Sequence, residues 1–381
     1  MLSQLTLRNF KSARDLTIPV GPLTILSGLN GSGKSTVLQA IALVRQSLQY
    51  SLDGLQRLVL RDNLVQLGLA EDVLSDLAAE NSVHIEITYE ADKRTHIVAV
   101  AEPGTDSLYI PDAPGRLDPV LRWLKFCSFQ FLQADRITPR THYDRADSAQ
   151  SADFLGARGE LTPDYLAEFG DRLDVRESRR CPMAVVGMPE GLMERIVATP
   201  RLNAQASGWL QQLSPGVRLE ASRLSSTDLV ALKYSYASTV IGAGEAPRRP
   251  SNVGFGLTYC LPIVVACLAA PPGALLLIEN PEAHLHPRGQ AALGALLAKC
   301  SNDGVQILVE THSDHVLNGV RLAVKRRNVN SDAVRVCHFT RDPVSGDSYI
   351  ETPGVLPNGE LTAWPDGFFD EWEKSLEALL S

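Results

Sequence analysis

The sequence contains no long hydrophobic run. Among its 381 residues, the longest apolar stretch is 257–270, which Pro262 interrupts and which falls short of the roughly 18 residues that suggest a membrane span. The N-terminal segment, MLSQLTLRNFKS, alternates apolar and polar residues and lacks the continuous apolar core of a signal peptide. We therefore expect a cytoplasmic protein that makes no use of a membrane.

Cysteine is also scarce, with six residues scattered along the chain and no Cys-x-x-Cys pair. This spacing argues against a structural zinc site and gives no support to a disulfide framework. Positive charge is in the minority, because 36 lysines and arginines face 44 aspartates and glutamates. The net charge of −8 excludes a generally basic nucleic-acid coat, although not a local basic groove.

The overall composition is that of a folded protein. Hydrophobic residues make up 44% and charged residues 21% of the chain, which excludes intrinsic disorder and collagen-like structure. At about 150 residues per domain, the length predicts two to three domains.

The strongest motif is GLNGSGKST, residues 28–36, which fits the pattern Gly-x-x-x-x-Gly-Lys-Ser/Thr. An apolar run that predicts a strand precedes it, and a predicted helix follows. In such a loop the backbone N–H groups and the lysine bind phosphate oxygens, and the next hydroxyl ligates Mg²⁺. The sequence therefore predicts a nucleotide site. Its predicted binding residues are Asn30, Gly31, Ser32, Gly33, Lys34, Ser35 and Thr36.

Two more predicted buried strands end in residues that suit this chemistry. The run 274–278 leads to Glu279, where phosphate-loop ATPases place an acid that helps to hold Mg²⁺; capping of the next helix is the alternative. The run 306–310 leads to His312, from which an imidazole would reach a γ-phosphate, although a lone histidine is more often structural. We predict Ser35 and Glu279 as metal ligands and His312 as catalytic.

Together these motifs resemble head ATPases of the ABC type, in the branch shared by SMC, RecF and OLD proteins. The segments NFKS and GLNGSGKST resemble the N-terminal lobe of that branch, and NPEAHLHP and ETHSDH resemble its C-terminal lobe. The segments FLQADRITPR, GARGELTP, SNVGFGLTYCLPIV and WPDGFFDEW resemble a family of predicted bacterial ATPases with a short C-terminal domain of unknown function. That family is associated with anti-phage defence, in Septu-type and retron-type ATPases.

The resemblance implies an α/β fold, a P-loop NTPase of the ABC-ATPase type. Its head would have two lobes, a mixed central sheet and an inserted helical region. The implied divisions are an N-terminal lobe over 1–135, a mostly helical insert over 136–250, a C-terminal lobe over 251–341 and a docking segment over 342–381.

The docking segment ends in a stretch with helical periodicity, which gathers apolar residues on one face. This face consists of Phe368, Trp372, Leu376 and Leu379. It predicts a helix that packs on its own domain or binds a partner.

In this branch two heads sandwich ATP, and a signature segment of one head meets the nucleotide of the other. The matching segment is SNVGFGLTY, residues 251–259, in which Gly254 and Gly256 would let the backbone approach the partner's γ-phosphate. The segment departs from the usual LSGGQ, so its donor stays open, and a loop before a core helix is the structural alternative. The candidate donors are Ser251, Asn252 and Thr258. Phe10 and Lys11 would approach the nucleotide or pack in a hairpin.

One departure from the family pattern concerns the general base. ABC heads usually carry Asp-Glu at the end of the Mg²⁺ strand, but the pair here is Glu279-Asn280, and an amide cannot accept a proton. Glu282 can replace the base, His312 and the partner's loop can support slow hydrolysis, or the site can act as a switch. Because general base catalysis contributes about 10²- to 10⁴-fold, we predict weak ATP hydrolysis that depends on dimerisation.

Other polar residues leave alternatives open. Glu282, His284 and His286 have a spacing that suits a metal, but we expect them to form a structural loop. Arg136 and Arg140 would bind a phosphate or carboxylate, or form a structural ion pair.

We therefore predict an ATP- and Mg²⁺-dependent homodimer, or higher oligomer, that regulates a separately encoded nuclease or toxin. No acidic cluster suited to a two-metal nuclease follows His312. The alternatives are a RecF-like ATPase that clamps DNA and a scaffold that binds ATP without hydrolysis. A basic stripe would favour DNA, but its candidates lie among acids, which favours a solvated charged helix. These candidates are Arg172, Arg176, Arg179 and Arg180.

Overall fold

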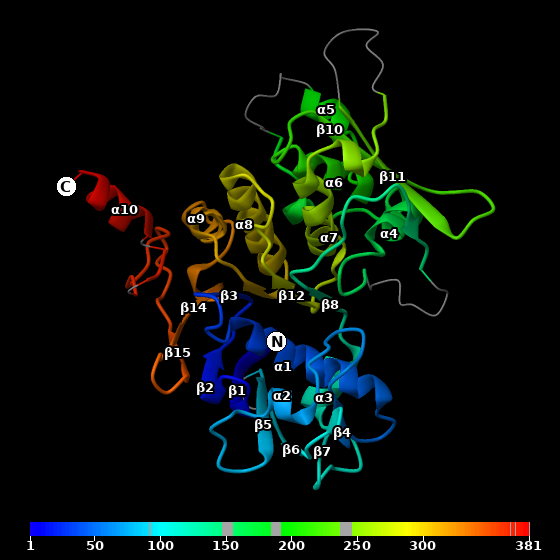
Figure 1. The fold of residues 1–381 in the computed structure, drawn as a ribbon. Coiled ribbons are helices and arrows are strands. Elements are labelled where there is room, and N and C mark those ends of the chain that lie inside the picture. The colour runs from blue at the N-terminus through cyan, green and yellow to red at the C-terminus, as the bar shows by residue number, and fades with distance from the viewer. Residues whose placement is uncertain are drawn as a thin grey trace. The chain divides into compact units, whose positions relative to one another are not determined.

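The computed structural model describes residues 1–90, 93–146, 155–183, 192–236, 246–365, 367–369 and 371–380. The chain forms two compact units, coloured along the sequence in Figure 1. Unit 1 comprises Met1–Cys127, Gln306–His312 and Asn330–Ser381, and unit 2 comprises Ser128–Val305 and Ser313–Val329. The units divide the chain differently from the predicted lobes, because a late strand pairs with the strand of the phosphate loop.

Unit 1 contains an antiparallel sheet in the order β2-β1-β5-β6-β7-β4. Its strands are β1 (Leu2–Phe10), β2 (Ala13–Pro19), β4 (Arg57–Val59), β5 (Ser82–Tyr89), β6 (Lys93–Val100) and β7 (Ser107–Tyr109). Alternate residues of β1 and β5 are buried, among them Leu5, Leu7, Ile85 and Ile87. Burial of one face explains why these strands alternate apolar and polar residues.

The second sheet of unit 1 has the order β15-β14-β3-β13. Its strands are β3 (Leu23–Gly28), β13 (Gln306–Glu310), β14 (Val334–Arg341) and β15 (Ser348–Glu351). Strand β3 pairs in parallel with both β13 and β14, and β14 pairs with β15 antiparallel. All five residues of β13 are buried, as expected for a central parallel strand.

The helices of unit 1 are short apart from the one after the phosphate loop. They are α1 (Lys34–Ser47), η1 (Leu48–Tyr50), α2 (Ala70–Val73), α3 (Pro119–Phe126), η4 (Ser331–Ala333) and α10 (Glu371–Leu380). Of the predicted apolar face near the C-terminus, Phe368 is buried and its ring lies 5.1 Å from that of His338. Leu376 and Leu379 are exposed, and the side chain of Trp372 lies outside the described residues.

Unit 2 has a parallel strand pair packed with long helices. The strands are β8 (Phe129–Leu132) and β12 (Leu275–Glu279), and the helices are α7 (Phe255–Ala269), α8 (Pro287–Asn302) and α9 (Asp314–Lys325). Helices α8 and α9 lie side by side (Figure 1). They approach closely at two glycines: a Cβ on Gly294 would lie 2.2 Å from the Val316 carbonyl oxygen, and one on Gly319 would lie 2.1 Å from that of Ala291.

The remainder of unit 2 holds more strand than we predicted. Its elements are β9 (Tyr143–Asp144), α4 (Thr162–Phe169), η2 (Glu177–Arg179), α5 (Leu192–Ile196), α6 (Leu202–Leu210), β10 (Val217–Arg223), β11 (Leu229–Tyr236) and η3 (Pro250–Asn252). The prediction of a mostly helical insert is wrong for 217–236, where β10 and β11 form an antiparallel hairpin. Alternate residues Val230, Leu232 and Tyr234 are among the buried residues of this hairpin, which follows the period of a strand.

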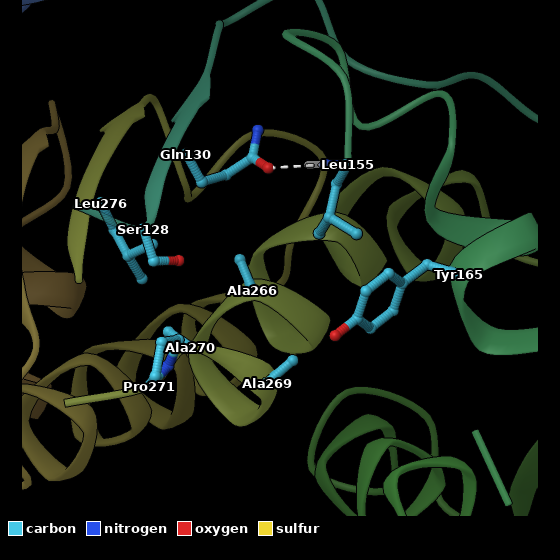
Figure 2. Close-up of a pocket in the computed structure, with 9 residues that line it drawn as sticks. All are labelled: Ser128, Gln130, Leu155, Tyr165, Ala266, Ala269, Ala270, Pro271 and Leu276. Carbon is cyan, nitrogen blue, oxygen red and sulfur yellow. Dashed lines mark hydrogen bonds between the residues drawn. The ribbon is translucent and has the colours of Figure 1, made fainter. Parts of the chain in front are cut away.

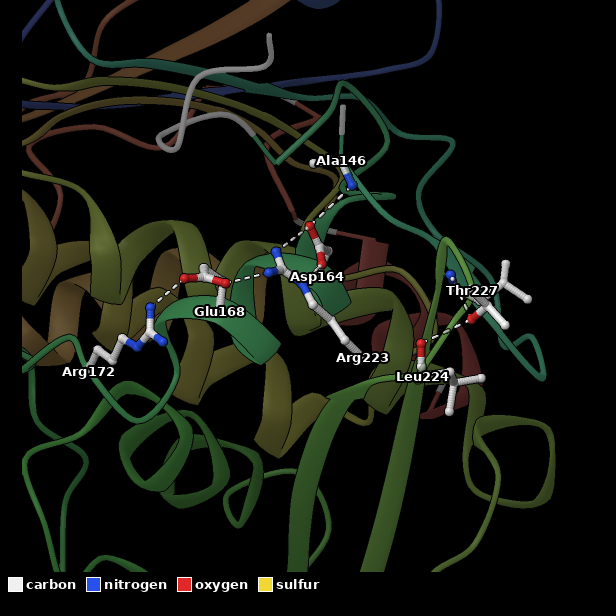
Figure 3. Close-up of polar contacts among 8 residues, drawn as sticks. Ala146, Asp164, Glu168, Arg172, Arg223, Leu224 and Thr227 are labelled. Atoms are coloured by element: carbon white, nitrogen blue, oxygen red, sulfur yellow. Dashed lines mark hydrogen bonds and ion pairs between the residues drawn. The ribbon is translucent and has the colours of Figure 1, made fainter. Parts of the chain in front are cut away.

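An ionic network joins this hairpin to α4 (Figure 3). The Arg223 guanidinium at the end of β10 forms two bonds to Asp164, with Nε to Oδ1 at 2.7 Å and Nη2 to Oδ2 at 3.1 Å. It also pairs with Glu168, which pairs in turn with Arg172. The backbone N–H of Ala146 donates to Asp164 at 3.1 Å. Bidentate pairing with a buried carboxylate fixes the hairpin against the helix.

The helices in the described part of the chain include none long and apolar enough to span a membrane.

Replacing Gly294 by alanine should lower the free energy of unfolding by about 1–3 kcal/mol, because the added methyl group must push α8 away from α9. Helix propensity alone predicts the opposite sign, since alanine favours a helix over glycine by up to about 1 kcal/mol. Thermal denaturation compares this variant with Gly115→Ala, where a Cβ meets nothing within 4 Å. Equal or higher stability of Gly294→Ala would show that the close approach is absent.

Candidate functional site

The phosphate loop lies in unit 1 between β3 and α1, and its glycines have conformations that other residues rarely adopt. The φ angles of Gly28, Gly31 and Gly33 are 138°, 76° and 101°. A Cβ on Gly28 would also lie 2.2 Å from the Phe339 carbonyl oxygen. Glycine at these positions lets the backbone curl so that its N–H groups and the N-terminus of α1 can bind an anion.

Lys34 is buried, and its side chain folds back inside this curl. Its Nζ donates to the carbonyl oxygens of Gly28 at 3.0 Å and Leu29 at 2.7 Å. Ser32 Oγ is buried and has no hydrogen-bond partner among the residues that the structure describes. A buried hydroxyl without a hydrogen-bond partner suits a ligand with oxygen acceptors, because buried polar groups are normally hydrogen-bonded. The residues present therefore fit a nucleotide phosphate.

Among the other predicted phosphate contacts, Thr36 is buried, whereas Asn30 and Gly31 are exposed at the tip of the loop. The space around Gly31 is open, since a Cβ there would meet nothing within 4 Å. The tip is therefore accessible, while Lys34 and Thr36 hold its base.

Glu310 is a residue of this site that the sequence reasoning missed. It is the last residue of β13, and its Oε1 accepts a hydrogen bond from Ser35 Oγ at 3.0 Å. The same oxygen lies 3.9 Å from Lys34 Nζ, and both side chains are almost fully buried. Hydroxyl and carboxylate oxygens are the ligands that Mg²⁺ prefers, so Ser35 and Glu310 fit this ion. The sequence signal for Glu310 is an acid at the end of a buried strand, the same signal that led to the prediction of Glu279.

The NFKS segment packs against the phosphate loop from the turn between β1 and β2. Phe10 is fully buried, which supports hairpin packing for this residue. Lys11 has a φ of 53°, and its Nζ donates to Gln39 on α1 at 2.6 Å. Ser12 Oγ accepts from Ser348 Oγ at 3.0 Å, and a Cβ on Gly33 would lie within 3 Å of both hydroxyls. The segment therefore supports the loop, and nucleotide contact by Lys11 stays a prediction.

His312 follows Glu310 by two residues and belongs to unit 1 as well. Its side chain is exposed, and its contact with a bound γ-phosphate stays a prediction.

In unit 2, Glu279 ends β12 with its carboxylate held by the backbone. The Ala134 N–H donates to Glu279 Oε2 at 2.8 Å. Asn280 has a φ of 42°, and its Oδ1 is buried without a partner in the described part of the chain. Glu282 is half-buried in the turn that follows. The structure thus places the predicted acid, Asn280 at the usual position of the base, and the candidate base Glu282 around one strand end.

The two arginines that the sequence left open have different environments. Arg136 is fully buried and donates to the backbone carbonyl oxygens of Glu279 and Asn280. Its ligands are therefore carbonyls, and neither the phosphate nor the ion-pair alternative describes it. Arg140 is exposed, and its backbone N–H donates to Tyr143 Oη at 3.0 Å.

The signature-like segment opens α7, and its two glycines differ in environment. A Cβ on Gly254 would meet nothing within 4 Å, whereas one on Gly256 would lie 2.4 Å from the His284 carbonyl oxygen. Gly256 thus serves packing within unit 2. Thr258 was a wrong candidate donor, because it is buried and its Oγ1 lies 3.3 Å from Tyr234 Oη.

The exposed candidates that remain for this segment are Ser251 and Asn252. His284 and His286 have structural environments: the His284 ring packs on Phe255 at 4.5 Å, and His286 caps α8. Gly254 is exposed, and its contact with a partner's phosphate stays a prediction.

The four arginines of the predicted basic stripe do not lie on a charged helix. The segment holds only the short η2, and most of the guanidinium groups have acidic partners. Arg176 Nε and Arg179 Nε lie 2.7 and 2.8 Å from Asp303, and Arg180 Nε donates to the Val175 carbonyl at 3.2 Å. This arrangement gives no support to a surface that binds phosphates of DNA.

A small cavity in unit 2 is a poor candidate for the nucleotide (Figure 2). Ser128, Gln130 and Tyr165 supply its polar groups, and none of the described residues that line it is charged. Gln130 Oε1 accepts from the Leu155 N–H at 2.8 Å, so part of this polarity is used internally. Phosphates require the donors found at the phosphate loop.

Comparison with protein families agrees with these features. A model described as "AAA ATPase domain" matches residues 1–175, and one described as "AAA domain, putative AbiEii toxin, Type IV TA system" matches 197–318. A protein family of unknown function matches residues 329–379. An OLD nuclease of Thermus scotoductus is 50% identical over 44 residues, which are 12% of this chain and 8% of that protein.

Similarity to solved structures identifies the fold. An SMC head bound to the C-winged helix domain of ScpA is 15% identical, with a TM-score of 0.53 over 93% of this chain and 98% of the other. The SMC head domain from Thermotoga maritima is 15% identical, with a TM-score of 0.44 over 92% and 98%. The chain has the ABC-type P-loop ATPase fold of an SMC head domain. As its motifs predict, it is similar to ATPases of the AAA, SMC and OLD type.

Replacing Glu310 by glutamine should raise the Mg²⁺ concentration needed for tight ATP binding by roughly 10- to 100-fold, the usual cost of removing a group that orients a metal ligand. Calorimetric titration of ATP at several Mg²⁺ concentrations measures this. The control is Glu351→Gln, an exposed acid at the end of β15. An unchanged Mg²⁺ dependence would remove Glu310 from the metal site.

Proposed function

We propose that this chain binds ATP with Mg²⁺, dimerises around the nucleotide and hydrolyses it slowly. The observation that carries the proposal is the phosphate loop, in which buried Lys34 lies inside the curl and Ser35 is bonded to Glu310. A buried ammonium beside a buried carboxylate, with the unpartnered Ser32 hydroxyl in the same loop, suits a phosphate and metal site better than a generic turn.

The residues divide the chemistry among them. The N–H groups of the loop and Lys34 would bind the β- and γ-phosphates, and Ser35 and Glu310 would hold Mg²⁺. Glu279, which the sequence predicts as a further ligand of this ion, belongs to unit 2. When bound, Mg²⁺ neutralises charge on the phosphates. His312 contacts the γ-phosphate, and the signature-like segment of a second copy, with Gly254 exposed, closes the site.

The slow rate follows from the residue after Glu279. The Asn280 amide has no basic atom, so it can position a water molecule but cannot remove its proton. Glu282 is the candidate base, because it lies two residues further along the same turn and keeps a carboxylate. If Glu282 does not accept the proton either, the protein binds ATP without hydrolysis and acts as a scaffold that ATP assembles.

Regulation of a separate effector is the biological role that we propose, in anti-phage defence and in the cytoplasm. One of the matched family descriptions names a putative toxin of a type IV system, and the partial relative is an OLD nuclease. The similar SMC head binds a domain of ScpA, which supports partner binding by heads of this fold. ATP would hold the closed dimer, and its loss would release a nuclease or toxin. The alternative of a DNA clamp loses support, because arginines of its predicted basic stripe form ion pairs with Glu168 and Asp303.

Purified protein should hydrolyse ATP at less than about 10 s⁻¹, the median of typical enzymes. Lys34→Ala should abolish both ATP binding and ATP-dependent dimerisation, because the phosphates lose their buried cation. Single-turnover hydrolysis and light scattering on the same sample measure both. The control Lys325→Ala removes an exposed lysine at the end of α9. ATP binding that survives in Lys34→Ala would refute the proposal.

Glu282→Gln should slow single-turnover hydrolysis by about 10²- to 10⁴-fold while ATP-dependent dimers still form, because only the proton acceptor is lost. Glu220→Gln, an exposed acid on β10, is the matched control. Hydrolysis at the wild-type rate would exclude Glu282 as the base and leave His312 and the partner's loop.

A further inference from the structure

Arg136 is among the largest fully buried side chains of the protein, with 1% of its surface exposed. Its Nε donates to the Tyr259 carbonyl at 3.3 Å, and its two Nη atoms donate to the carbonyls of Gln133, Glu279 and Asn280. Burying a guanidinium is costly, and an apolar side chain would fill the space more cheaply. Four bonds to backbone indicate that its task is to fix the positions of these segments.

The same group of residues also encloses the Glu279 carboxylate. The Tyr259 ring lies 4.4 Å from the Arg136 guanidinium carbon, and its hydroxyl donates to the Ala134 carbonyl. The N–H of Ala134 donates to Glu279 Oε2 at 2.8 Å. Arg136 and Tyr259 thus hold both ends of Glu279, the carbonyl directly and the carboxylate through Ala134.

A chain of ring contacts continues from Tyr259 to the surface. The edge of the Tyr259 ring meets His284 with centroids 5.0 Å apart, and His284 meets Phe255 at 4.5 Å. Phe255 is 40% exposed and lies between Gly254 and Gly256, at the start of α7. All these residues belong to unit 2, so contact is continuous within one unit from the exposed start of α7 to Glu279.

We propose that Arg136 is a positioning residue that couples the signature-like segment to Glu279 and Asn280, an inference that rests on the proposed ATPase function. A second copy's nucleotide at Gly254 would displace Phe255 and the first turn of α7. Close-packed rings pass this displacement to Tyr259, and the four-fold attachment of Arg136 passes it to the turn after β12. Each protomer would then hydrolyse its own ATP only while it contacts its partner's nucleotide.

The test separates turnover from binding. Arg136→Lys keeps the charge but cannot reach four carbonyls. Phe255→Ala removes the exposed end of the series of ring contacts. Both should lower kcat by roughly tenfold to 100-fold, as small misplacements of catalytic groups do, and change the KM for ATP by less than about twofold. Nucleotide binding is expected to persist because Lys34 and Ser35 lie in unit 1.

Arg179→Lys is the matched control. Arg179 is a second fully buried arginine of unit 2, and it donates to the carbonyls of Cys267 and Ala270 and pairs with Asp303. Its replacement measures the general cost of losing a buried guanidinium, which we expect to appear in stability and not in kcat. If Arg136→Lys and Arg179→Lys lower kcat equally, or if Phe255→Ala keeps the wild-type kcat, the coupling is refuted.

Failure of the proposed function has a different signature. If the wild-type protein shows no ATP turnover while Lys34→Ala binds ATP as the wild type does, both the ATPase proposal and the role of Arg136 in it are overturned. If the wild type turns over ATP and Lys34→Ala does not, a normal rate in Arg136→Lys overturns the coupling alone.

Discussion

The burial of one ammonium group constrains the whole phosphate loop. Lys34 has left water, so its charge must be met by oxygen atoms that the fold supplies. Two carbonyls of the loop and the Glu310 carboxylate provide them. Glu310 comes from a distant strand and lies 275 residues after Ser35 in the chain. The parallel pairing of β3 with β13 is therefore a condition for the site as well as for the sheet.

In unit 2, two buried arginines donate hydrogen bonds to backbone carbonyl oxygens. Arg136 joins the ends of two strands to α7, and Arg179 joins the ends of two helices through Cys267, Ala270 and Asp303. Carbonyl oxygens at the ends of strands and helices have no partner in their own element. A guanidinium has five donors in a fixed plane, so one side chain satisfies several such oxygens. Rigid strand ends position Glu279, which could not be held so firmly by a loop alone.

Much of this arrangement could be predicted from sequence, because phosphate loops and buried strands have strong local patterns. The loop at 28–36 and the strand at 306–310 were recognised in this way. Glu310 was missed because the functional role at the end of this strand was assigned to His312, two residues further along. Only strand pairing reveals that its carboxylate meets Ser35. The hairpin over 217–236 was mistaken for helix because the continuous apolar run 229–232 hides the two-residue period that Lys233 and Tyr234 follow.

The partners of the arginines were beyond reach for a different reason. Backbone carbonyls carry no signature in sequence, so Arg136 could be assigned neither a phosphate nor a carboxylate on residue type alone. The same holds for Gly256, whose role depends on the His284 carbonyl. Contacts between side chain and backbone become visible only once the fold is known.

The backbone at Asn280 has an evolutionary consequence. Its φ of 42° lies in the left-handed region, which asparagine tolerates and which costs most other residues roughly 1–2 kcal/mol. A single replacement of Asn280 by glutamate would therefore place a carboxylate in a strained turn. A glutamate at this position would need a second change that reshapes residues 280–284 to relieve the strain. Replacement of this asparagine is therefore constrained by the backbone as well as by the chemistry of the site.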